Sequence, residues 1–298
     1  MGIIRSRAKI MLEAKTQGVD FSSTLTLGRQ KNNMTQRELA YLRKSYGIDP
    51  HPDSNKLLKY RSYADLFFLH YLCVKKLSVI DYSDYENADI IHDMNQPVPE
   101  SLWESFDVVI DGGTLEHIFN FPTAIKNCMM MVNKGGSIFI FSMANNHCGH
   151  GFYQFSPELF FRVFEENNGF NIRSVVLVKH PFPGAELSQR QECYKVSDPK
   201  IIGRRSSLVS RSPLGIMVHA IKISAMPIFL NSPNQSDYTS RWANENGREI
   251  SGGDNNKFRL FFKQVYSKLP LRIRLWLSGY RQLWKFNLRR DIDFYNPW

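Results

Sequence analysis

Phe106-Asp107-Val108-Val109-Ile110-Asp111-Gly112-Gly113-Thr114-Leu115-Glu116-His117 is the stretch that decides the fold. Its apolar run, rich in valine and isoleucine, ends abruptly in an aspartate and two glycines, which is the pattern of a buried strand. A helical segment that begins with the Glu-His pair is expected to follow. Because ligands of open parallel sheets bind just beyond the carboxyl ends of strands, Asp111, Gly112, Glu116 and His117 are expected to lie at a site.

Strand patterns alternate with helical patterns on both sides of this stretch, and the alternation predicts βαβ units. We therefore predict an α/β fold with a doubly wound, mostly parallel sheet. The last two strands are joined by a loop, so they are expected to form an antiparallel hairpin at one edge. The predicted strands are 22–27, 77–80, 88–91, 106–110, 137–143, 171–179 and 214–224, and the predicted helices are 2–17, 36–44, 62–74, 120–132 and 156–167.

The basic charge of the chain is confined to its C-terminal part. Ten of the 38 basic residues lie between Lys257 and Arg290, where no acidic residue occurs, so the remaining 28 balance the 28 acidic residues. This location argues against reading the whole chain as a nucleic-acid-binding protein. We predict three parts: a domain over 1–224, a polar linker over 225–256 and a basic amphipathic helical tail over 257–298.

The basic tail allows two interpretations. Aromatic and aliphatic residues, Trp276 and Tyr280 among them, share one helical stripe, while Arg274, Arg281, Lys285 and Arg289 share another. Such a helix suits the surface of an anionic membrane, here through residues 257–290. Alternatively, the apolar stripe packs on the domain and the charges are solvated.

The rest of the composition bears on the compartment. The chain has no apolar run long enough to cross a membrane and no apolar signal segment at its start. Its four cysteines form no Cys-x-x-Cys pair, which suits reduced thiols. We expect a cytoplasmic protein, held peripherally at the inner face of the membrane if the tail binds lipid.

Acidic residues stand at or just past the ends of three predicted strands: Asp81, Asp93 and Asp111. Carboxylates in these positions can accept hydrogen bonds from ribose hydroxyls or from the exocyclic amine of adenine. Any one of them alone could be a turn or helix-cap aspartate. Three in successive βα units favour a ligand that contains a nucleoside.

With these residues in view, the chain from about 22 to 224 resembles the class I S-adenosylmethionine-dependent methyltransferases. The similarity rests on Ile80-Asp81, on Asp93, on the quoted strand with Leu115-Glu116-His117, and on Lys134-Gly135-Gly136. The resemblance implies a seven-stranded sheet whose last strand is antiparallel, and S-adenosylmethionine as cofactor. It also implies cofactor-binding roles for Leu27, Gly28, Arg29, Asp81, Tyr82, Asp93, Met94, Asp111 and Gly112.

The chain departs from that family after its first strand, where the family carries a loop with several glycines. Here the sequence reads Thr26-Leu27-Gly28-Arg29-Gln30, with one glycine and no acidic residue. We expect Gly28 to be the point where backbone approaches the cofactor. Arg29 or Gln30 is expected to reach the methionine carboxylate.

Methyl transfer needs alignment of the reactants, and a general base when the acceptor is a hydroxyl. The candidate bases are His117, His147 and His150, of which His117 and His150 are preferred, with Glu116 as the orienting group. His147, Cys148 and His150 also suggest a metal site, but they would need further ligands, so no metal is predicted.

Two functions are kept open from the sequence. The first is methyl transfer to a small-molecule or glycan-like acceptor at a membrane surface. The alternative is a non-catalytic binding module with the same fold in a surface-polysaccharide assembly, which the single glycine at Gly28 would favour.

Overall fold

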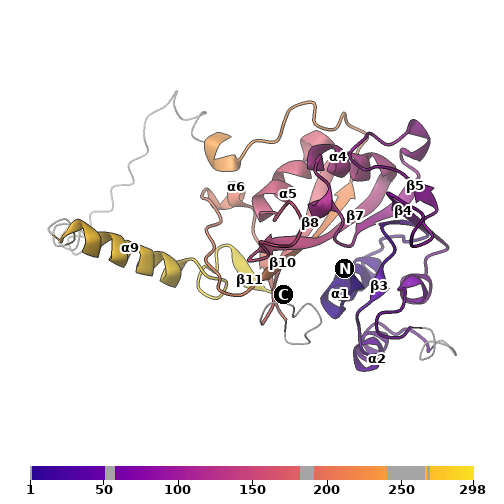
Figure 1. The fold of residues 1–298 in the computed structure, drawn as a ribbon, viewed down its shortest axis with the longest axis horizontal. Helices are drawn as coiled ribbons and strands as arrows, with labels where there is room; N and C mark the ends of the chain where they lie inside the picture. The colour runs from indigo at the N-terminus through magenta and orange to yellow at the C-terminus, as the bar shows by residue number, and fades with distance from the viewer. Residues whose placement is uncertain (1, 51–57, 182–190, 240–265, 267–268) are drawn as a thin grey trace.

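The computed structural model describes residues 2–50, 58–181, 191–239, 266 and 269–298. A central sheet is covered on both faces by helices and turns, which confirms the α/β, doubly wound prediction (Figure 1). Two separate apolar cores lie against the two faces, because successive side chains of a strand point to opposite sides. In β6 (Phe106–Asp111), Val109 joins one core and Val108 and Ile110 join the other.

Nine strands form the central sheet, in the order β11-β9-β8-β10-β7-β6-β2-β4-β5. The sheet is parallel from β7 through β6, β2 and β4 to β5, which is one edge strand. The bounds are β2 Ser23–Leu27, β4 Lys76–Asp81, β5 Ile90–Ile91, β7 Val132–Asn145, β8 Phe170–Lys179, β9 Glu192–Val196, β10 Leu214–Lys222 and β11 Tyr295–Pro297.

The antiparallel strand expected near the end of the domain is β10, which pairs antiparallel with both β7 and β8. It lies inside the sheet, so the prediction of a hairpin at the edge is corrected. Beyond β8 the sheet continues with β9 and ends at the edge strand β11, and these two strands raise the predicted seven to nine. Both extra strands are short, and β11 pairs with a strand far away in the sequence. Neither gives a long apolar signal of its own.

The helices distribute over the two faces. On one face the core includes residues of α1 (Arg5–Thr16), α2 (Gln36–Ser45) and the π-helical turn η1 (Phe67–Tyr71). On the other it includes residues of α4 (Phe121–Met131) and α5 (Pro157–Val163). The remaining elements are β1 Gly2–Ile3, β3 Lys31–Asn32, η2 Glu100–Leu102, η3 Leu115–His117, η4 Glu166–Asn168, α6 Pro199–Ile202 and α9 Leu271–Lys285.

Two helical predictions differ from the structure. The helix expected over 62–74 is shortened to residues 65–71, and it ends there because Cys73 takes the left-handed backbone conformation (φ 59°) and redirects the chain into β4. The segment after Asp111 is a single 3₁₀ turn, η3, in place of a longer helix.

The C-terminal tail leaves the domain and then returns to it. Helix α9 extends away from the sheet and has no buried residue (Figure 1). The chain beyond it packs on the domain, since Leu288, Phe294 and Tyr295 are buried and β11 pairs with β9. Arg289, which was expected to continue the basic stripe, lies past the end of α9 and bonds to Glu192. The boundaries 1–224, 225–256 and 257–298 stay a prediction, and residues 257–265 lie outside the described part of the chain.

Candidate functional site

The parallel strands end at a common edge, and most predicted site residues lie there. Leu27 is level with Ile80 of β4 and with Asp111 of β6. Gly28 follows with a left-handed backbone (φ 67°), and its N–H donates to the carbonyl of Ile80 at 2.8 Å. A side chain at Gly28 would start 3.5 Å from Oδ2 of Asp81. Gly28 therefore leaves a space in front of the Asp81 carboxylate that any larger residue would narrow.

Asp81 and Tyr82 stand at the end of β4. The backbone N–H of Tyr82 donates to Oδ1 of Asp81 at 2.7 Å, which fixes the direction of the carboxylate. The Tyr82 side chain is 75% exposed, so its ring is available to a ligand. Oδ2 of Asp81 remains directed toward Gly28. A carboxylate held in this way can accept hydrogen bonds from vicinal hydroxyls.

Arg29 and Gln30 are both held by the protein. The guanidinium of Arg29 pairs with Asp65 and lies 4.2 Å from the centre of the Tyr63 ring. The side-chain amide of Gln30 donates to the carbonyls of Leu27 and Gly28, at 3.0 and 3.1 Å. Gln30 also packs directly on Gly112, where a Cβ would lie 1.9 Å from its Oε1. The Gln30 side chain thus fills the space between the first loop and β6.

Asp93 and Met94 follow β5. The N–H of His92 donates to the carbonyl of Asp81 at 2.8 Å, and this bond brings the start of the loop to the end of β4. Asp93 accepts from the backbone and side-chain nitrogens of Asn95, and these bonds lower its pKa. Met94 is buried in the core beside α4. The structure therefore shows a turn-forming role for Asp93.

Asp111 organises the turn that carries the Glu-His pair. Its Oδ1 accepts from the N–H groups of Gly113, Thr114 and Leu115, at 3.1, 2.7 and 3.3 Å. The side chain is 1% exposed, and burial, with a contribution from Glu116, raises its pKa. Asp111 thus holds the turn that leads into η3, and its carboxylate is buried away from solvent.

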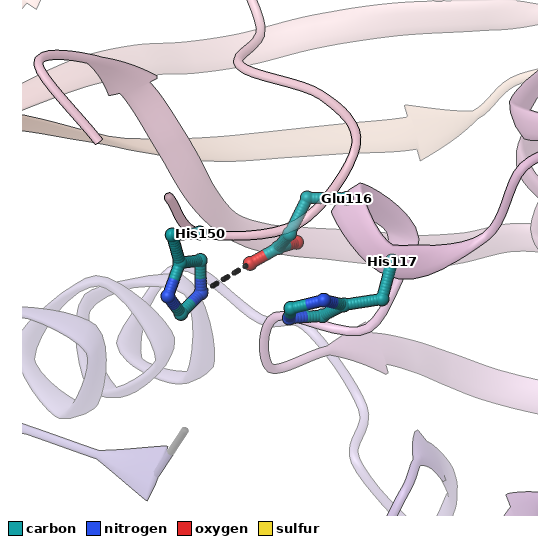
Figure 2. Close-up of side chains that lie close together, drawn as sticks. All are labelled: Glu116, His117 and His150. Atoms are coloured by element: carbon teal, nitrogen blue, oxygen red, sulfur yellow. Dashed lines mark ion pairs between the residues drawn. The ribbon is translucent and has the colours of Figure 1, made fainter. Parts of the chain in front are cut away.

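Glu116, His117 and His150, the residues expected to form the catalytic group, lie close together beside this turn (Figure 2). Glu116 is fully buried, His117 is exposed and His150 is partly exposed. Nε2 of His150 lies 3.6 Å from Oε1 of Glu116, and the two imidazole centres are 5.1 Å apart. Burial raises the pKa of Glu116, whereas burial and the neighbouring His150 lower that of His117.

The loop after β7 is fixed on η3, which explains why His150 meets Glu116. The N–H groups of Phe152 and Tyr153 donate to the carbonyl of Glu116, at 2.8 and 3.2 Å. Gly151 adopts φ 75°, and a Cβ on it would lie 2.7 Å from the same carbonyl oxygen. Only glycine allows this approach without displacement of the loop.

Three residues at the site escaped the sequence prediction. Ser142 of β7 donates its Oγ–H to Oε2 of Glu116 at 2.8 Å. Arg7 of α1 is buried, donates to the carbonyl of Gly112 at 3.3 Å and lowers the pKa of Glu116 electrostatically. Asp65 holds Arg29. Only Ser142 gave a local signal in the sequence, because it is a serine within an apolar strand. Arg7 and Asp65 reach the site from distant segments and gave no such signal.

Two exposed aromatic residues flank the two histidines. Phe119 and Phe152 are 73% and 68% exposed, and their rings meet edge to face with centres 6.0 Å apart. Each follows one of the site histidines by two positions. An exposed aromatic pair beside convergent polar groups is a suitable contact for the ring of a small ligand.

Comparisons with known proteins give similarity to solved structures, many of them methyltransferases. No family model and no curated protein matches the chain. It is similar to the N-methyltransferase NodS of Bradyrhizobium japonicum WM9, with 15% identity, a TM-score of 0.37, and coverage of 74% of this chain and 96% of that one. The 1,6-didemethyltoxoflavin-N1-methyltransferase of Burkholderia thailandensis, solved with S-adenosylhomocysteine, gives 10% identity, a TM-score of 0.37, and coverage of 74% and 78%.

A third similar structure is a branched-chain polyamine synthase mutein of Thermus thermophilus, with 12% identity and a TM-score of 0.37. The match covers 79% of this chain but only 60% of that one. Other similar structures include S-adenosylmethionine-dependent methyltransferases, the class that the sequence motifs resemble. Similarity at this level does not assign an activity, so the function is argued from the residues themselves.

Proposed function

We propose that this chain transfers a methyl group from S-adenosylmethionine to a hydroxyl of a small or glycan-like acceptor. The observation that carries the proposal is the space at Gly28, with Asp81 facing it across the strand ends and the Glu116–His117–His150 group at the next turn. Asp81 suits the ribose hydroxyls, and Tyr82, Asp93 and Met94 flank the expected adenine position. The floor of the proposed cofactor site would be formed by Leu27, Asp111 and Gly112.

The Arg29–Asp65 pair fits the other end of the cofactor. The methionine part carries one carboxylate and one ammonium group, so Arg29 can bind the first while Asp65 binds the second. Gln30 would support this arrangement by fixing the loop, in place of the contact with the carboxylate expected from the sequence.

The chemistry at the acceptor follows from the histidine pair. S-adenosylmethionine supplies a methyl group on a cationic sulfur. The acceptor oxygen bonds to the methyl carbon as its proton passes to His150 or His117, and the sulfur leaves as a neutral thioether. Glu116 orients His150. Phe119 and Phe152 would pack on the acceptor ring, and this packing favours a sugar or another small ring.

A transfer assay tests this function. The purified chain is incubated with deuterated S-adenosylmethionine and fractionated small-molecule and glycan extracts, and labelled products are sought by mass spectrometry. We expect a labelled product whose formation falls at least tenfold in His150→Ala. Unchanged labelling in His150→Ala would refute the assigned chemistry.

The non-catalytic binding module remains the second candidate. Two contacts within the protein favour this candidate. Arg29 is paired with Asp65, and the side chain of Gln30 is bonded to the loop after the first strand of the domain, so neither residue is free for a cofactor. It predicts no labelled product with any acceptor fraction and no binding of S-adenosylhomocysteine. Binding of the cofactor without transfer would instead point to a missing acceptor.

The helix α9 supports an encounter with an anionic membrane. None of its side chains is buried, and Ile273, Trp276, Leu277, Tyr280 and Trp284 form an apolar stripe. Arg274, Arg281 and Lys285 lie beside that stripe, which matches a negatively charged lipid surface. No helix among the described residues is long and apolar enough to span a bilayer. From the exposure and charge of α9, we propose a peripheral location at the inner face of the membrane.

Flotation with vesicles tests the membrane contact. Deletion of 257–298 would also remove β11, so the double variant Trp276→Ser/Tyr280→Ser isolates the helix. We expect the wild type to float with phosphatidylglycerol vesicles at low salt and the variant to remain at the bottom. Tyr85→Ser, which changes an 87% exposed aromatic residue elsewhere, is the matched control. Equal flotation of the wild type and the double variant, or flotation of neither, would reject the membrane contact. A dimer held by α9 would instead show that this helix contacts a second copy of the chain.

A further inference from the structure

Glu116, His117 and His150 present three ligand atoms to one point. Glu116 and His117 project from η3, and His150 projects from the loop after β7 (Figure 2). One carboxylate oxygen and one ring nitrogen from each histidine all lie within 4.8 Å of one another. Convergence of two imidazoles and a carboxylate on one point is the arrangement that divalent transition metals use in open protein sites.

One oxygen of the buried carboxylate is directed at this point and receives no hydrogen bond from the part of the chain that the structure describes. Oε2 of Glu116 accepts from Ser142, but Oε1 has no hydrogen-bond partner among the described residues. Nε2 of His150, 3.6 Å away, also lacks one. A fully buried carboxylate oxygen without a donor is costly, so it calls for a cation or another donor.

The distance between these two atoms suits a shared ion better than a direct hydrogen bond. Hydrogen bonds between nitrogen and oxygen are about 2.7–3.2 Å long. Two ligand atoms about 2.1 Å from one tetrahedral ion lie roughly 3.4 Å apart. The observed 3.6 Å is close to the second value.

The surroundings hold the ligands in place and leave one side open. Ser142 fixes the carboxylate, and the bonds from Phe152 and Tyr153 to the Glu116 carbonyl fix the His150 loop against it. Such outer contacts orient metal ligands in proteins. His117 is exposed, so a fourth position faces solvent and can take a ligand oxygen.

We propose that Glu116, His117 and His150 bind a divalent transition-metal ion. Two imidazoles favour zinc, iron(II) or cobalt over magnesium and calcium, which prefer oxygen ligands. The expectation of no metal is thereby revised, and so is the candidate ligand set. Cys148 is exposed and is no member of the cluster, and His147 contributes no ligand atom to it.

The role of the ion in catalysis rests on the proposed methyl transfer, whereas the site itself does not. The ion binds the acceptor hydroxyl through its oxygen and lowers the pKa of that hydroxyl. Because both imidazoles are then bound to the ion, the proton leaves to solvent water. In the metal-loaded protein, a positioned, metal-bound oxygen therefore takes the place of the histidine base given under the proposed function.

Metal titration of the full chain tests the site. After treatment with chelator and its removal, Zn²⁺ is titrated in competition with a chromophoric chelator, and Co²⁺ is followed by its visible absorption. We expect one tight site. Glu116→Gln and His150→Ala should each weaken Zn²⁺ binding by more than tenfold. Ser142→Ala should weaken it by roughly tenfold. Cys148→Ser, on an exposed residue of the same loop, is the matched control and should change nothing.

Circular dichroism of each variant establishes that it is folded before its titration is interpreted. A thiolate-to-cobalt charge-transfer band, lost in Cys148→Ser, would overturn the ligand set. Absence of a tight site, or equal affinity in wild type and in folded Glu116→Gln, would overturn the metal site. A separate titration with S-adenosylhomocysteine distinguishes this failure from failure of the proposed function, since cofactor binding does not require the ion.

Discussion

Asp111→Ala should destabilise the domain, because one carboxylate oxygen caps three backbone N–H groups. Oδ1 accepts from Gly113, Thr114 and Leu115, and no other acceptor for these donors comes with the alanine. A net 0.5–1.5 kcal/mol for each bond gives a loss of roughly 2–4 kcal/mol in the free energy of unfolding. The midpoint of thermal unfolding should fall by roughly 5–10 °C.

Asp111→Asn is the matched control for this prediction. Its amide oxygen can keep the three hydrogen bonds, and it removes a carboxylate that is 1% exposed. We expect its stability to lie within about 1 kcal/mol of the wild type. Urea unfolding followed by tryptophan fluorescence measures all three proteins. The reasoning is refuted if Asp111→Ala unfolds at the wild-type urea concentration, or if Asp111→Asn is as unstable as Asp111→Ala.

Three further predictions concern single positions. Gly28→Ala should weaken the binding of S-adenosylhomocysteine at least tenfold, because the added methyl group lies beside the Asp81 carboxylate. Gly47→Ala, at a similar φ of 62° and with nothing within 4 Å of the added Cβ, should leave that binding unchanged. Gly151→Ala should displace the His150 loop and weaken Zn²⁺ binding at least tenfold. Gly149→Ala, where an added Cβ meets nothing within 4 Å, should leave the Zn²⁺ titration curve unchanged. Burial lowers the pKa of His219 to about 4. An unfolded histidine titrates near 6.5, so unfolding takes up a proton between these values and the free energy of unfolding should fall by about 3 kcal/mol from pH 7 to pH 4. The urea concentration at the unfolding midpoint measures this effect. If that midpoint falls as much between pH 7 and pH 4 in His219→Gln as in the wild type, the last prediction is contradicted.

The parallel centre of the sheet could be predicted because each strand carries its own signal. Phe106–Asp111 is an apolar run closed by an aspartate and two glycines, and Thr35 gives the capping box of α2. By contrast, β9 and β11 pair Tyr295 with Val196 across the sequence, and no local pattern encodes such a pairing. The place of β10 within the sheet was likewise fixed by pairing.

The site was predictable only where its members are neighbours in sequence. Glu116 and His117 are adjacent, and Asp81 follows an apolar run. His150 meets Glu116 only because Gly151 lets the loop approach η3, and the serine that holds Glu116 lies on β7. Arg29 was expected to point at a ligand, but its partner Asp65 comes from the next segment of the chain. Contacts between segments decide these details.

The measurement that tests the central claim most directly is calorimetric titration of the full chain with S-adenosylhomocysteine. We predict saturable binding of one molecule per chain, weakened at least tenfold in a folded Asp81→Ala variant. The account is contradicted if the wild type shows no binding, or if it binds with an affinity that Asp81→Ala leaves unchanged.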